Sequence, residues 1–246
     1  MKEKYKSGFA AIIGMPNVGK STLLNKIAGQ KIAIISEKPQ TTRNKILAIH
    51  TTDTEQIIFT DTPGIHKPHN KLGEFMVNAA NETMRDVDVL LFVIDATRPI
   101  QDVEREIVKN IAKTGLPCIL VMNKVDLVEK SNLLPMIADY SSMYDFESIV
   151  PMSAKSGDGV DVLLNDIKNY IPKGPQFYDE DMITDQPEKQ IAAEIIREKM
   201  LWLLDKEIPH GIAIEITKMQ EKEKITNIYA TIYCEKATHK GIIIGK

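Results

Sequence analysis

The chain has 246 residues and an ordinary composition, enough for one full α/β domain and part of a second. Its formal net charge of −3 gives no global basic field of the kind that indicates nucleic-acid binding. Two cysteines, Cys118 and Cys234, make no disulfide framework, and their apolar surroundings predict free thiols in a reducing cytoplasm. The longest apolar run, residues 89–94, is too short to span a bilayer, so we expect no transmembrane segment, while peripheral membrane association stays open.

The first motif in the chain is residues 14–21, Gly-Met-Pro-Asn-Val-Gly-Lys-Ser, which has the spacing of a phosphate-binding P-loop. An apolar run at 9–13 predicts a buried strand before it, and apolar residues at helical spacing over 21–28 predict a helix after it. In that context Lys20 reaches the outer phosphates and the Ser21 hydroxyl ligates Mg²⁺. The alternative, a plain glycine turn before a helix, is disfavoured by the motifs that follow.

A polar stretch at 41–43 precedes a predicted strand at 46–50. A threonine on such a loop can add its hydroxyl to Mg²⁺ and its N–H to a terminal phosphate, and it is held only while that phosphate exists. We prefer Thr42 to Thr41 for this switch. A threonine-rich surface loop would be the better interpretation if the P-loop were absent.

The next predicted strand, residues 56–60, leads into Asp61-Thr62-Pro63-Gly64. Asp61, at the carboxyl end of a strand beside the P-loop, can hold a water of Mg²⁺, and the Gly64 N–H can sense the γ-phosphate. Ile65 follows, where many related switch proteins carry a glutamine that orients the attacking water. Another group must therefore orient the water, or hydrolysis must be slow.

The motif at 123–126, Asn-Lys-Val-Asp, decides the nucleotide. The Asp126 carboxylate can accept hydrogen bonds from N1–H and the exocyclic amine of guanine, which adenine cannot offer. Asn123 braces the loops, Lys124 can lie along the base plane, and the Ala154 N–H can meet guanine O6. The elements expected around this motif are helices at 71–87, 101–113 and 159–170 and strands at 87–95, 117–122 and 148–152.

Strands that alternate with helices predict an α/β fold, a P-loop NTPase domain with a mostly parallel sheet and ligand loops at its carboxyl edge. The predicted nucleotide contacts are Gly14, Asn17, Val18, Gly19, Lys20, Ser21, Thr22, Asp61, Thr62, Pro63, Gly64, Asn123, Lys124, Asp126, Ser153, Ala154 and Lys155. The predicted Mg²⁺ ligands are Ser21, Thr42 and Asp61, and the predicted catalytic residues are Lys20, Thr42, Gly64 and Asn17.

The ordered motif set resembles small GTPases of the translation-factor class. More narrowly, Pro-Gln-Thr-Thr-Arg at 39–43 together with Asp-Thr-Pro-Gly-Ile at 61–65 resembles the Era family of bacterial ribosome-assembly GTPases. A helix expected from Glu194 to near residues 207–210 and strands expected at 213–218 and 226–235 are similar to the carboxy-terminal KH domain of that family. The domains expected are a GTPase domain at 1–172, a linker at 173–187 and a partial, incomplete α+β KH-like domain at 188–246.

The resemblance implies a cytoplasmic enzyme that binds and hydrolyses GTP with Mg²⁺, binds small-subunit ribosomal RNA and assists 30S subunit assembly. Because a KH domain grips RNA with a Gly-x-x-Gly loop and this chain stops at 244–246, Ile-Gly-Lys, we expect a truncated domain with impaired RNA binding. Relatives with an asparagine in the P-loop use K⁺, so as a hypothesis Asn17 helps to hold K⁺; a turn-forming asparagine is the alternative. Two other functions stay open: a tRNA-modification-type GTPase, and a nucleotide-gated RNA- or protein-binding module with negligible turnover.

Overall fold

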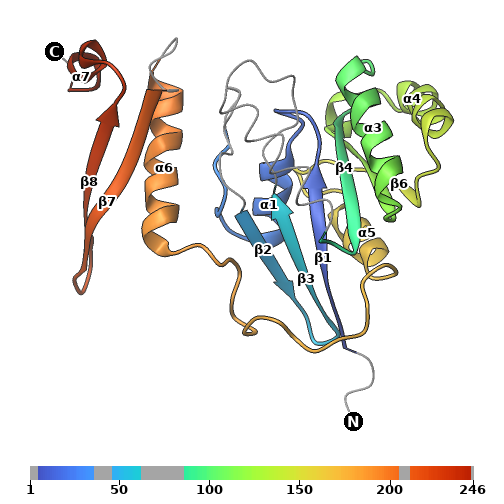
Figure 1. Cartoon of the computed structure of the whole chain (residues 1–246), viewed down its shortest axis with the longest axis horizontal. Helices are drawn as coiled ribbons and strands as arrows, with labels where there is room; N and C mark the ends of the chain where they lie inside the picture. Colours follow the sequence, from blue (N-terminus) through green and yellow to red (C-terminus); the bar gives the residue numbers. More distant parts are fainter. Residues whose placement is uncertain (1–4, 36–45, 62–85, 205–210, 245–246) are drawn as a thin grey trace.

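The computed structural model describes residues 5–35, 46–61, 86–204 and 211–244. Its first part is a six-stranded sheet with the strand order β2-β3-β1-β4-β5-β6, in which every pairing is parallel except that of β2 with β3 (Figure 1). The strands are β1 (Lys6–Ile13), β2 (Ile46–Thr51), β3 (Glu55–Asp61), β4 (Val89–Asp95), β5 (Cys118–Asn123) and β6 (Ser148–Pro151). The prediction of an α/β fold with a mostly parallel sheet is confirmed.

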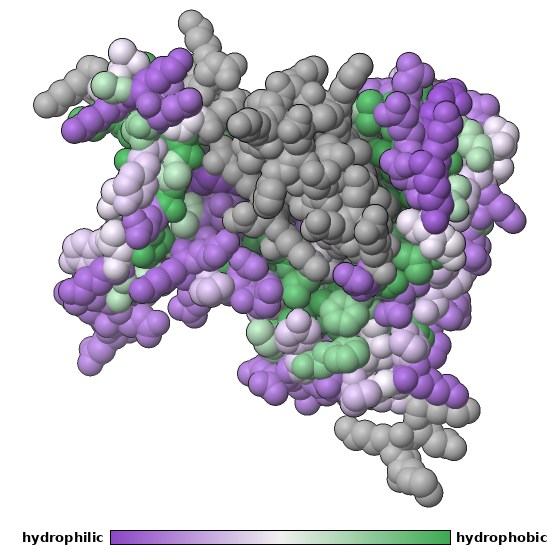
Figure 2. Space-filling model, viewed as in Figure 1, coloured by the Kyte–Doolittle hydropathy of each residue, from purple (hydrophilic) through white to green (hydrophobic). Residues whose placement is uncertain are grey.

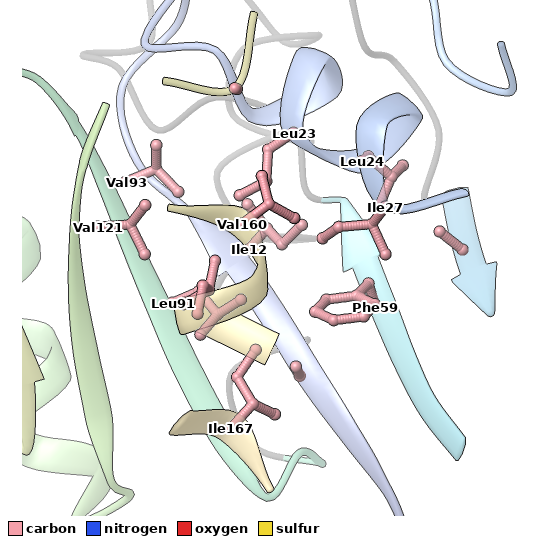
Figure 3. Packing of buried hydrophobic residues seen from close by; sticks show 14 of the residues in the cluster. Ile12, Leu23, Leu24, Ile27, Phe59, Leu91, Val93, Val121, Val160 and Ile167 are labelled. Atoms are coloured by element: carbon pink, nitrogen blue, oxygen red, sulfur yellow. The ribbon is translucent and has the colours of Figure 1, made fainter. Parts of the chain in front are cut away.

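Helices cover both faces of this sheet. They are α1 (Lys20–Ala28), α3 (Asp102–Thr114), α4 (Lys130–Met143) and α5 (Val160–Ile167), with a short 3₁₀ helix η1 (Val125–Leu127). One buried cluster joins α1 and α5 to the sheet, and Figure 3 shows Leu23 and Val160 from these helices directed toward Ile12 and Leu91 of the strands. A second cluster joins the opposite face of the sheet to α3 and α4.

The near-continuous apolar character of the central strands has its cause in this layering. Every residue of β4 and β5 is buried, because a parallel strand between two helical layers has no solvent face. Consecutive residues therefore enter opposite cores: Leu91 lies in the α1/α5 cluster and Phe92 in the α3/α4 cluster. The carboxyl ends of β1, β3, β4 and β5 meet at one edge of the sheet, and the strand order reverses around β1 there.

The segment expected to be a linker packs on the edge of the sheet. Gln56, which is fully buried, accepts the backbone N–H groups of Phe177 and Tyr178 at 2.8 and 3.0 Å. The Ile183 carbonyl accepts the Ile49 N–H at 2.9 Å, so the segment pairs with the outer side of β2. Covering an edge strand in this way satisfies its exposed hydrogen-bonding groups.

A second unit follows, built of α6 (Glu188–Leu203), the antiparallel pair β7 (Ile212–Glu221) and β8 (Thr226–Cys234), and α7 (Ala237–Ile244) (Figure 1). The expectation that the first helix runs from Glu194 to near 207–210 is wrong at both ends: α6 begins at Glu188, directly after Pro187, and ends at Leu203. The division into 1–172, 173–187 and 188–246 stays a prediction.

The second unit contacts the first through α6. Glu198, fully buried, pairs with Lys31 and accepts the Ile35 N–H at 3.0 Å, and the Trp202 indole N–H donates to the Ile35 carbonyl at 3.2 Å. Both backbone groups of Ile35 are thus bound by one helix. Figure 2 shows hydrophilic side chains over much of the second unit with apolar ones between them. The large apolar side chains exposed in β8 are Ile228, Tyr229, Ile232 and Tyr233.

Candidate functional site

The predicted P-loop is the turn between β1 and α1. Gly14 has a φ of 150°, and a Cβ there would lie 2.3 Å from the Val93 carbonyl oxygen. Gly19 has a φ of 102°, and a Cβ there would lie 2.1 Å from Asn123 Nδ2. Only glycine fits at either position, because both the backbone conformation and the approach of β4 and β5 exclude a side chain.

Lys20 is the first residue of α1, and its side chain folds back into the loop. Its Nζ donates to the carbonyl oxygens of Gly14 at 3.2 Å and Met15 at 2.8 Å. Burial lowers the pKa of Lys20 to about 8, although the nearby Asp61 carboxylate acts in the opposite direction. A buried ammonium at a helix N-terminus whose first turn carries no acidic residue favours an anionic ligand.

The predicted Mg²⁺ ligands that the structure describes meet in space. The Ser21 hydroxyl donates to Asp61 Oδ2 at 2.9 Å, and Asp61 is fully buried at the end of β3. A hydroxyl and a carboxylate oxygen are ligands that Mg²⁺ accepts, and this ion commonly takes only one or two carboxylates beside substrate phosphates. The residues present therefore fit a Mg²⁺ ion. Thr22 follows on α1, half-buried.

Asn123 joins three loops at the carboxyl edge of the sheet. Its Nδ2 donates to the Val18 carbonyl at 2.8 Å, and its Oδ1 accepts the Ala154 N–H at 2.9 Å. The bracing predicted for Asn123 is thus present in the geometry. The same contact gives the Ala154 N–H a partner within the protein, so its predicted bond to guanine O6 requires that this donor be shared or exchanged.

The other base-side residues lie around Asn123. Lys124 has a left-handed backbone with φ 66°, and its Nζ donates to the Asn17 carbonyl at 2.9 Å and to Asp95 Oδ2 at 2.6 Å. Asp126 lies exposed in η1, and its contact with the base stays a prediction. Ser153 is buried after β6, and Lys155 is exposed. Sequence reasoning missed Asp95, although an acid at the carboxyl end of a buried strand is a detectable signal.

Four predicted residues lie outside the described part of the chain: Thr42, Thr62, Pro63 and Gly64. Their roles stay predictions, as does that of Ile65. In the part of the chain that the structure describes, no helix is both long and apolar enough to cross a membrane.

Comparisons with known proteins agree with this arrangement. The model of the 50S ribosome-binding GTPase family matches residues 9–124. The GTPase Era of Ruminiclostridium cellulolyticum is 57% identical over 245 residues, which cover 98% of this chain and 82% of the relative. The crystal structure of Era in complex with MgGDPNP and nucleotides 1506–1542 of 16S ribosomal RNA matches with a TM-score of 0.92 and 41% identity, covering 98% of this chain and 83% of that one. An Aquifex aeolicus Era variant bound to GDP·AlF4⁻ matches with a TM-score of 0.91, 41% identity and the same coverage of both chains.

Proposed function

The chain belongs to the Era family of GTPases, and we therefore propose that it is a GTP-dependent switch acting on the small ribosomal subunit. It binds GTP with Mg²⁺, hydrolyses GTP to GDP and phosphate, and binds small-subunit ribosomal RNA to assist assembly of the 30S subunit. This activity belongs in the cytoplasm, and peripheral membrane association stays a prediction.

The observation that carries the proposal is the double hydrogen bond of Asn123. One side chain fixes the carbonyl of Val18 in the P-loop and the N–H of Ala154 in the loop after β6. The loops proposed to bind the phosphates and the base are therefore joined by one side chain, as a site for a whole nucleotide requires. Asp126, exposed beside them, supplies the acceptor that distinguishes guanine from adenine.

Binding energy comes first from charge. The Lys20 ammonium, which the protein holds at its own loop carbonyls, can turn to the β- and γ-phosphate oxygens. Phosphate oxygens replace two neutral acceptors with anionic ones, and charge-assisted hydrogen bonds are roughly twice as strong as neutral ones. Ser21 and Asp61 would hold Mg²⁺, which supplies neutralisation of the charge that develops on the β- and γ-phosphates.

Two finer roles belong to the proposal. Thr42 and Gly64 would bind the γ-phosphate side and be released on hydrolysis, which is how order in a loop reports the nucleotide state. Asn17, an exposed residue of the P-loop, would help to hold K⁺ near the β- and γ-phosphates, as its resemblance to relatives with an asparagine at this place suggests. Equal hydrolysis rates in KCl and NaCl at matched ionic strength would rule out the K⁺ role.

The ribosomal RNA partner is proposed from the complex of Era with a 16S ribosomal RNA segment. The second unit, α6 to α7, falls within the 98% of this chain that this complex matches, which disfavours a tRNA-modification-type GTPase. Residues 173–246 carry 11 Lys and Arg against 13 Asp and Glu, a net charge of 11 − 13 = −2, so RNA contact must use local rather than overall positive charge.

Single-turnover hydrolysis tests the enzyme function. Enzyme in excess over labelled GTP should release phosphate in the presence of Mg²⁺, and should release none after chelation by EDTA or when ATP replaces GTP. Tight GTP binding without phosphate release would instead identify a nucleotide-gated binding module. Gel-shift titration with a 3′-terminal fragment of 16S ribosomal RNA tests the partner, with a double-stranded RNA of equal length as control.

A further inference from the structure

Among the described residues, Asn17 and Lys124 are the only non-glycine residues with a positive φ, 65° and 66°. They lie 107 positions apart in the sequence, yet one hydrogen bond of 2.9 Å joins them, from Lys124 Nζ to the Asn17 carbonyl. A left-handed conformation costs a residue with a Cβ roughly 1–2 kcal/mol. A third group that binds Lys124 would help to keep this contact in place.

Asp95, the last residue of β4, supplies that group. Its Oδ2 accepts from Lys124 Nζ at 2.6 Å, while its Oδ1 accepts the Thr97 N–H at 3.0 Å and the Thr97 hydroxyl at 2.6 Å. The Asp95 side chain is only 3% exposed. Because the two donors of Thr97 fix one carboxylate oxygen, the other oxygen is aimed at the Lys124 ammonium.

The strand register explains why this pair forms. Asp95 of β4 lies opposite Asn123 of β5, and the Ala96 N–H donates to the Asn123 carbonyl at 2.9 Å. Lys124 therefore leaves β5 directly beside the carboxylate. Burial raises the pKa of Asp95, but the hydrogen bonds from Lys124 and Thr97 together lower it by more than burial raises it. The net shift of the pKa is therefore downward, and the carboxylate is an anion at neutral pH.

We propose that Asp95 is a positioning residue for guanine-nucleotide binding, which acts by holding the Lys124 ammonium between the base-binding loop and the Asn17 carbonyl of the P-loop. This inference rests on the proposed nucleotide function and adds to it a residue outside the sequence motifs. Asp95 binds the side chain of Lys124, and it is not itself among the predicted nucleotide contacts. Through Lys124 it couples the base end of the site to the phosphate end.

The variant Asp95→Asn tests this role. Asparagine keeps the carbonyl oxygen that serves Thr97 but places an amide against the Lys124 ammonium. We expect the affinity for fluorescent mant-GDP to fall about 10- to 100-fold, the range for loss of one hydrogen bond between charged groups. The single-turnover hydrolysis rate at saturating GTP should stay within about twofold, because Asp95 touches no reacting group.

Two controls separate positioning from a structural role. Thr97→Ala removes the hydroxyl donor but keeps the Thr97 N–H that also holds Asp95 Oδ1 and leaves Lys124 in place, and Arg98→Ala removes an exposed cation 3.4 Å from Asp95 Oδ2. Both should leave the mant-GDP affinity within about threefold. In a Lys124→Met background, Asp95→Asn should have no further effect, since its route of action is already lost.

The outcomes are distinguishable. If the unaltered protein fails to bind mant-GDP, the proposed function fails. If it binds and Asp95→Asn binds equally well, or if Asp95→Asn weakens binding equally with and without Lys124, the positioning role is overturned. Should Asp95→Asn not fold, Asp95→Ser removes the carboxylate with a smaller side chain. Unchanged affinity in that variant also overturns the role, while a loss that disappears in the Lys124→Met background supports it.

Discussion

Glu198 offers a direct test of how the second unit is attached. Its carboxylate is fully buried and binds two groups of the first unit, the Lys31 ammonium and the Ile35 N–H at 3.0 Å. Replacement by alanine removes both contacts. The Lys31 side chain is 39% exposed, so its pair contributes about 0–1 kcal/mol, whereas the hydrogen bond from the Ile35 N–H to a buried anion contributes about 1.5–3 kcal/mol.

We therefore expect Glu198→Ala to weaken the attachment of α6 by about 2–3 kcal/mol. Glu198→Gln, which keeps an acceptor for the Ile35 N–H, should cost about 1 kcal/mol. Lys189→Ala, on the exposed face of the same helix, is the matched control and should change the attachment by less than about 0.5 kcal/mol.

Tryptophan fluorescence provides the assay. Trp202 is the single tryptophan of the chain, and its indole N–H donates to the Ile35 carbonyl in the same contact. Glu198→Ala should increase quenching of this fluorescence by acrylamide and accelerate hydrogen exchange of the Ile35 amide. An unchanged exchange rate of the Ile35 amide in Glu198→Ala would refute the view that this carboxylate attaches α6, because protection of the amide would then not depend on the carboxylate.

Two further predictions concern the P-loop. The pKa of Lys20 is lowered to about 8 and bound phosphate favours the ammonium, so nucleotide binding above that pH takes up a proton. The affinity for GDP should therefore be constant near pH 7 and fall toward about tenfold per pH unit by pH 9. An affinity measured by calorimetry that does not change over this pH range would contradict the prediction. Gly19→Ala places a Cβ 2.1 Å from Asn123 Nδ2 and should reduce GDP affinity about tenfold or more. The control Gly29→Ala, at a residue with a φ of 70°, places a Cβ that has no other atom within 4 Å and should not reduce GDP affinity. Equal losses of affinity for the two variants in filter binding would exclude collision with Asn123 as the cause.

Much of the first unit is predictable from sequence for a physical reason. Strands buried on both faces appear as uninterrupted apolar runs, as at 89–94, and the P-loop glycines occupy backbone positions that no other residue can adopt. Such constraints act on neighbouring residues, so they can be recognised from the sequence. Asn123, Lys124 and Asp126 likewise follow one strand in order.

The features that escaped prediction depend on distant partners. The helix α4 packs an apolar stripe against the sheet, Leu133, Met136, Ile137, Tyr140 and Met143, but it carries Pro135 in its interior, a residue that normally argues against a helix. Asp95 and Glu198 are charged residues whose burial is set by Lys124 and by Ile35, far away in the sequence. Sequence periodicity reports which face of an element is buried but not which group from another element satisfies a buried charge.

The central claim, that this site recognises guanine and hydrolyses its triphosphate, is tested most directly by the nucleotide preference of Asp126→Asn. Xanthine carries a carbonyl where guanine carries its 2-amino group, so an asparagine amide can donate to it while still accepting from N1–H. Single-turnover phosphate release by the unaltered protein should favour GTP over XTP, and Asp126→Asn should reverse that order. An Asp126→Asn protein that still prefers GTP would contradict the assignment of Asp126, and with it the account of the whole site.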